Sequence, residues 1–185
     1  RRFPAHPLAG DAHFRMGEIA YGEDAFDRAA AAYEAALAAG VTFTDKVLYK
    51  LGWACERLEK RDAACAAFRR LAAECPESEL AGEARYREGR LLQEGGAWQA
   101  AAAAYAAVPA GAFAERAAFG RAECLRLGKQ AQEAVAAYRA VLQHAADATI
   151  KMQAWLGLGH AYREAGANKD AIEAYGEVVK LTETV

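Results

Sequence analysis

The stretch "WLGLGHAYREAGANKDAIEAY", Trp155–Tyr175, decides the fold of this chain. Apolar residues recur every three or four positions on both sides of "AGANKD", a spacing that is typical of amphipathic helices. The Gly, Asn and Asp residues in the middle favour a turn. Within this stretch Gly159 stands on the first predicted helix, and Ala171 and Tyr175 stand on the second. The stretch therefore predicts two antiparallel helices, A and B, joined by a short turn.

The same small residue–alanine–aromatic spacing recurs four more times along the chain. The earlier copies are Gly17/Ala29/Tyr33, Gly52/Ala64/Phe68, Gly89/Ala101/Tyr105 and Ala122/Ala134/Tyr138, so that successive copies lie 35, 37, 33 and 37 residues apart. One helical pair cannot bury its apolar face alone, and stacking such pairs creates a continuous core. The sequence predicts an all-α array of about five helix–turn–helix repeats, at approximately 9–40, 43–75, 79–109, 112–145 and 149–182.

The repeated residue types have a packing rationale. A small residue on helix A and an alanine on helix B allow the two backbones to approach closely. The aromatic residue one turn further along helix B is expected to fill the gap toward the neighbouring repeat.

The chain resembles the tetratricopeptide-repeat family. The last repeat matches the pattern W-x2-L-G-x2-Y…A-x3-[FY] at Trp155, Leu158, Gly159, Tyr162, Ala171 and Tyr175, and the second matches at Leu48, Leu51, Gly52, Ala64, Phe68 and Pro76. The fourth repeat departs from the pattern at Ala122, and the third has Glu88 where an apolar residue is usual. The resemblance implies a right-handed superhelical solenoid, but the motif residues are structural and name no partner.

A finer resemblance concerns the starts of two repeats. "CPESELAGEARYREG", Cys75–Gly89, aligns without gaps with "FPAHPLAGDAHFRMG", Phe3–Gly17. The shared pattern is similar to repeats of bacterial cell-envelope proteins, such as the outer-membrane assembly lipoprotein of the barrel-assembly machine and the Tol-Pal-associated periplasmic protein. Because Cys75–Pro76 closes a helix B, Phe3–Pro4 should close one that precedes residue 1. We therefore expect a segment excised from a longer, bacterial protein, with the periplasm or envelope favoured and the cytoplasm as the alternative.

Composition excludes several classes of function. The formal net charge is -2 and no long run of Lys or Arg occurs, which argues against nucleic-acid binding. No apolar stretch is long enough to span a bilayer, so direct membrane insertion is not expected. The four cysteines, Cys55, Cys65, Cys75 and Cys124, form no C-x-x-C pair, so no metal site is expected. They are interpreted as small buried helix residues, with a Cys55–Cys65 disulfide as an alternative, and they suit a reducing compartment better than an oxidising one.

The resemblance implies that the A helices line a concave groove. Positions three before, one after and four after the motif glycine are expected to face this groove, and they carry aromatic and charged residues that suit peptide binding. The alternative is that the aromatic rings pack between adjacent A helices. The predicted groove residues are Phe14, Glu18, Tyr21, Tyr49, Trp53, Tyr86, Arg90, Phe119, Arg126, His160 and Arg163.

These residues predict a protein-interaction scaffold that holds a peptide or a partner helix within a multiprotein assembly. Two alternatives remain: a docking or regulatory arm of a larger enzyme, and an array that self-associates through apolar end faces. One subgroup of the family grips chaperone tails with paired Lys and Asn residues. In this chain the corresponding positions hold Phe14, Glu18, Tyr49 and Trp53, so binding of chaperone tails is not expected. No cofactor and no enzymatic activity are expected, since no histidine has a catalytic partner and pairs such as Glu83–Arg87 are interpreted as solvated helix pairs.

Overall fold

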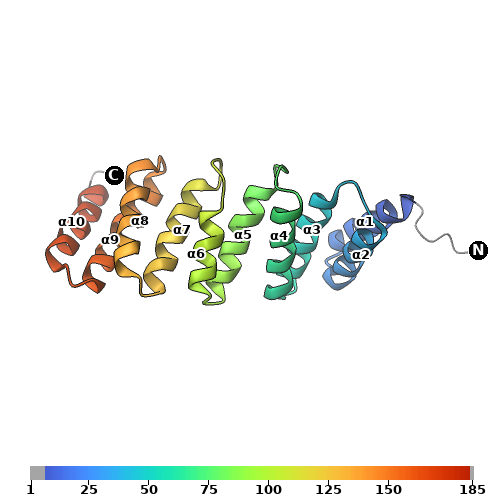
Figure 1. Ribbon diagram of the computed structural model, residues 1–185, viewed down its shortest axis with the longest axis horizontal. Coiled ribbons are helices and arrows are strands. Elements are labelled where there is room, and N and C mark those ends of the chain that lie inside the picture. Colours follow the sequence, from blue (N-terminus) through green and yellow to red (C-terminus); the bar gives the residue numbers. More distant parts are fainter. Residues whose placement is uncertain (1–6, 184–185) are drawn as a thin grey trace, which may run out of the picture. The chain divides into compact units, whose positions relative to one another are not determined.

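The computed structural model describes residues 7–183, and every element in that range is an α-helix. Figure 1 labels the helices in chain order. Their bounds are α1 Pro7–Gly22, α2 Phe26–Ala39, α3 Thr44–Arg57, α4 Arg61–Glu74, α5 Ala81–Glu94, α6 Trp98–Ala106, α7 Ala114–Leu127, α8 Ala131–His144, α9 Ala148–Glu164 and α10 Asn168–Glu183. Phe3–Pro4, the expected end of an earlier helix B, lies outside the described residues. Within 7–183 no helix has both the length and the apolar character needed to cross a bilayer.

The helices fall into two compact units, and the boundary between the units lies inside α5, after Leu91. In the first unit α1 packs on α2, α2 on α3, and α3 on α4. In the second unit α6, α7, α8, α9 and α10 pack in the same successive manner. Successive helices from α1 to α4, and from α6 to α10, therefore pack on one another, as expected of stacked helical pairs.

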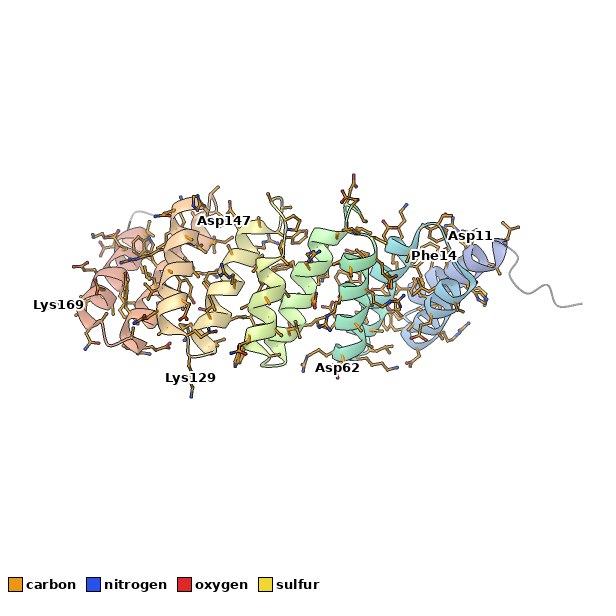
Figure 2. The ribbon with its side chains drawn as sticks, viewed as in Figure 1. Asp11, Phe14, Asp62, Lys129, Asp147 and Lys169 are labelled. Atoms are coloured by element: carbon orange, nitrogen blue, oxygen red, sulfur yellow. The ribbon has the colours of Figure 1, made fainter. Side chains whose placement is uncertain are left out.

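One turn geometry joins helix A to helix B in every repeat. Its central residue has a positive φ: 58° at Asp24, 57° at Glu59, 75° at Gly96, 61° at Lys129 and 78° at Gly166. In each case the amide of the following residue donates a 2.9 Å hydrogen bond to a carbonyl five residues earlier, as Gln130 does to Leu125. This bond satisfies a carbonyl at the end of helix A. Figure 2 labels Lys129 at the α7–α8 turn and Asp147 at the other end of α8, where α9 begins.

The core consists mainly of alanines around a few large side chains. The motif alanines Ala29, Ala64 and Ala134 are fully buried, and so are the aromatic residues Tyr33, Phe68 and Tyr138. All four cysteines are free thiols; Cys55, Cys65 and Cys124 are buried and Cys75 is half-buried. Burial raises the pKa of Cys124 to about 11, so this cysteine is a protonated, unreactive core residue at neutral pH.

Glycines create the space that the large rings occupy. A Cβ atom on Gly52 of α3 would lie 2.6 Å from the ring of Phe68, which comes from helix B of the same repeat. In contrast, a Cβ atom on Gly157 of α9 would lie 2.5 Å from the ring of Tyr138, which comes from the preceding repeat. The motif aromatic thus packs on helix A of its own repeat in one case and against the next repeat in the other.

Candidate functional site

The first predicted groove residue, Phe14, is part of the core of the first unit. It lies on α1 (Figure 2), and only 9% of it is exposed. Its ring centroid is 5.8 Å from that of Tyr33 and 5.1 Å from that of Phe43. Phe14 therefore adds almost nothing to the surface, and its ring packs against Tyr33 of helix B and Phe43 just before α3.

Glu18 and Tyr21, the other predicted residues on α1, contact a lysine of α3. Glu18 accepts a 2.6 Å hydrogen bond from the Tyr33 hydroxyl and pairs with Lys50 Nζ at 3.2 Å. The same Nζ lies 5.8 Å from the Tyr21 ring centroid. Burial raises the pKa of Tyr33 far above its usual value, and the hydrogen bond to Glu18 raises it further. These contacts fasten α1 to α3 and hold Glu18 in one place.

Tyr49 and Trp53 of α3 are half-buried and meet an arginine from α5. The Arg87 guanidinium lies 3.6 Å from the Trp53 ring centroid, which is a close cation–π contact. The Tyr49 and Trp53 rings meet edge to face with centroids 6.2 Å apart. Arg87 also binds Glu83 at 2.8 Å, and only 15% and 19% of the two side chains are exposed. The interpretation of Glu83–Arg87 as a solvated pair is therefore wrong, because the Trp53 ring and α3 shield it.

Tyr86 and Arg90 are the predicted residues of α5, and both are half-buried. Arg90 donates a 2.7 Å hydrogen bond to Glu56 of α3, and Arg87 lies 3.7 Å from the second oxygen of the same carboxylate. The Glu56 carboxylate therefore forms ion pairs with two arginines. The side chains on this face of α3 and α5 therefore form one connected network, held together by contacts within the chain. Its members are Tyr49, Trp53, Glu56, Glu83, Arg87 and Arg90.

The remaining predicted residues lie in the second unit, on α7 and α9. The Phe119 ring packs 6.1 Å from Tyr138, whose hydroxyl donates a short hydrogen bond to Glu123. Arg126 binds Glu123 at 3.3 Å and Glu164 of α9 at 2.9 Å. These contacts join the A helices of two successive repeats, as Glu56 and Arg90 do in the first unit.

His160 of α9 lies edge-on to Tyr175, with the ring centroids 5.6 Å apart. Burial lowers the pKa of His160, and the positive charges of Arg126 and Arg163 lower it further. At neutral pH the ring is therefore uncharged. Arg163 itself is exposed. Among residues 7–183 no three His, Cys, Asp or Glu side chains gather in a way that could hold a metal ion.

Sequence reasoning missed the residues that connect the predicted ones. Lys50 and Arg87 lie outside the predicted groove positions, yet they join α1 to α3 and α3 to α5. Glu56, which binds Arg87 and Arg90, stands at a predicted position, four residues after Gly52. Such residues can be found in the sequence by looking for opposite charges about one repeat apart, as for Glu56 and Arg90. They cannot be found by comparing the residues that stand at the same motif position in each repeat.

Comparison with known proteins identifies the repeats. Residues 46–78 and 116–148 match one model described as tetratricopeptide repeat, and residues 153–184 match another with the same description. The chain gives no match among curated proteins.

Several solved structures share the fold. A crystal structure of the MamA protein superposes with a TM-score of 0.74 at 19% identity, over 96% of this chain and 94% of that one. The structure titled "MamA 41-end from Desulfovibrio magneticus RS-1" gives 0.67 at 16%, over 95% and 96%. YrrB, described as a TPR protein with an unusual peptide-binding site, gives 0.69 at 17%, over 91% and 84%. The chain is therefore an all-α helical-repeat protein built of tetratricopeptide repeats.

Proposed function

We propose that this chain is a protein-interaction scaffold that binds a peptide or a partner helix on the A-helix face of its first unit. The observation that carries the proposal is the network of Tyr49, Trp53, Glu56, Arg87 and Arg90 on α3 and α5. Aromatic and arginine side chains provide most of the binding energy in protein interfaces. Here contacts within the chain already restrict their rotamers, so binding loses less conformational entropy.

Two comparisons support this proposal. The family of the matching repeats is typical of interaction scaffolds, and the matching models describe repeats rather than a catalytic domain. YrrB, which shares the fold, is described as having a peptide-binding site. The predicted division into five repeats and the membership of an envelope assembly remain parts of this proposal, the latter supported by the resemblance of Cys75–Gly89 to envelope repeats.

Selection of random displayed peptides on the immobilised chain tests the function. We expect selected peptides to lose at least tenfold in affinity for Trp53→Ala, measured by fluorescence anisotropy, when circular dichroism shows that this variant is folded. Trp98→Ala is a matched control, since Trp98 is also half-buried but lies at the start of α6, a B helix. Equal binding to wild type and Trp53→Ala would place the interaction elsewhere and contradict the proposed face.

Self-association is the second candidate, and exposed aliphatic side chains favour it. On α1, Met16 is 58% exposed and Ile19 65%; on α10, Ile172 is 71% exposed and Val179 54%. Sedimentation at several concentrations tests this alternative. Oligomers that disappear in Ile19→Ser/Ile172→Ser would support it, and a monomer at all concentrations would dismiss it. A docking arm of a larger enzyme is the third possibility, which the flanking gene sequence tests.

A further inference from the structure

A cleft of about 720 Å³ opens between α8, α9 and α10 in the second unit. Its size is within the range of pockets that enclose a small ligand or a few residues of a peptide. Trp155 and Tyr162 of α9 form its apolar part with Leu158, and Leu142 and Ala174 add to it from the two flanking helices. None of the groove residues predicted from the sequence lines this cleft.

The two motif aromatics in this cleft are incompletely covered. Trp155 and Tyr162 are half-buried, whereas Leu158 between them is only 2% exposed. Earlier repeats hold smaller side chains at these two positions, for example Leu48 and Cys55 in the second repeat. The last repeat therefore presents two aromatic rings to the solvent at a place where the second repeat presents none.

The walls of the cleft carry unequal charge. From α10 the lining contains three carboxylates, Asp170, Glu173 and Glu177, and one small apolar side chain, Ala174. From α8 it contains the positive charge of Arg139. Glu177 also pairs with Lys180 at 2.6 Å, but 71% of the Lys180 side chain is exposed, and such surface pairs contribute little and exchange readily. The cleft thus has excess negative charge beside an aromatic surface.

One contact inside the cleft shows what chemistry its rings accept. The Arg139 guanidinium lies 5.5 Å from the Tyr162 ring centroid, within the range of a cation–π contact. The cleft therefore already holds one guanidinium of its own chain against an aromatic face. Further guanidinium or ammonium groups near Trp155 would find both an aromatic ring and the carboxylates of α10.

We propose that this cleft binds a short basic segment of a partner protein, in which two arginine or lysine side chains alternate with aliphatic ones. Glu173 and Glu177 are one helical turn apart, which is a rise of about 6 Å. Side chains at positions i and i+2 of an extended peptide are about 6.6 Å apart on the same side. Two basic residues in this spacing match the two carboxylates, and the aliphatic residues cover the apolar lining.

The test uses two labelled synthetic peptides, ALRVRLA and its acidic counterpart ALEVELA, with the whole chain at low salt. We expect ALRVRLA to bind and ALEVELA not to bind in fluorescence anisotropy. The isosteric double variant Glu173→Gln/Glu177→Gln should weaken binding at least tenfold. Glu133→Gln removes an exposed carboxylate of α8 outside the lining, and it should leave the affinity unchanged.

The indole N–H signals of the three tryptophans locate the bound peptide in an NMR spectrum. The peptide should shift the signal of Trp155 and leave those of Trp53 and Trp98 in place. A shift of Trp53 instead, or equal affinity for wild type and Glu173→Gln/Glu177→Gln, would overturn the proposal. The Trp53→Ala variant separates this site from the proposed peptide face of the first unit, since it should keep full affinity for ALRVRLA.

Discussion

Gly157→Ala is expected to destabilise the protein, although alanine is the better helix former. Gly157 lies within α9, and a Cβ atom there would lie 2.5 Å from Cε1 and Cζ of Tyr138 and 2.7 Å from its hydroxyl oxygen. The Tyr138 ring is fully buried, and its hydroxyl is bonded to Glu123. The ring therefore has no free direction in which to move, and the two helices must separate to admit the methyl group.

Two opposing contributions determine the size of the effect. Replacing a helical glycine with alanine stabilises a helix by about 1 kcal/mol. Overfilling a packed core costs about 1–3 kcal/mol, and the fixed ring places this site near the upper end. The free energy of unfolding should therefore fall by about 2 kcal/mol. Urea denaturation followed by far-ultraviolet circular dichroism measures this difference.

Gly176→Ala is the matched control for the helix-propensity contribution. Gly176 lies inside α10, and nothing is within 4 Å of the position of its Cβ atom. This variant should gain about 1 kcal/mol of stability. The two glycine-to-alanine changes are thus expected to have opposite signs.

A second background tests the proposed collision directly. Leucine in place of Tyr138 lacks all three atoms that lie nearest the added methyl group, namely Cε1, Cζ and the hydroxyl oxygen. In the Tyr138→Leu background, Gly157→Ala should become neutral or mildly stabilising. If Gly157→Ala stabilises the wild type, or costs the same in both backgrounds, the packing argument is refuted.

Three further outcomes are expected. Lys129→Gly should raise stability by about 1 kcal/mol in urea denaturation, because Lys129 has a φ of 61°, a region that costs a side chain roughly 1–2 kcal/mol. Glu56→Ala should lower the free energy of unfolding by about 1–3 kcal/mol, because Glu56 is only 18% exposed and its loss leaves two arginines without this acceptor. Glu74→Ala, which removes the exposed pair with Arg70, should lower it by less than about 0.5 kcal/mol. The folded-state pKa of His160 is lowered, so the unfolded chain binds its proton first and stability should decline as pH falls below about 6.5, a dependence that His160→Gln should reduce in thermal unfolding at pH 5 to 7.

The helices and turns could be predicted because their causes are local. The A–B turn has a residue with positive φ two positions before helix B begins, and the sequences "EGGAW" and "AGANKD" place Gly96 and Gly166 there. The contact between the motif glycine and the motif aromatic could also be predicted from their spacing, as Gly52 and Phe68 show. The contact between Gly157 and Tyr138 was less visible, because it joins two repeats and its glycine stands two positions before the motif glycine.

The candidate site could be predicted only in part, because the exposure of each side chain depends on the neighbouring repeat. Phe14 and Tyr49 both stand three residues before the motif glycine, yet Phe14 is buried against Phe43 whereas Tyr49 is half-buried and its ring meets Trp53. Neither outcome follows from a column of equivalent positions.

The cross-repeat ion pairs show what a better sequence test requires. Glu56 and Arg90 are 34 residues apart, and Arg126 and Glu164 are 38 apart, so both pairs bracket the repeat period. A test that compares charges one period apart would find these pairs and would show which A helices they join. For Glu173 of α10, the positively charged residue from another repeat in the cleft lining is Arg139. Arg139 already lies over the Tyr162 ring. That remaining negative charge is the physical reason to expect a basic segment from outside the chain.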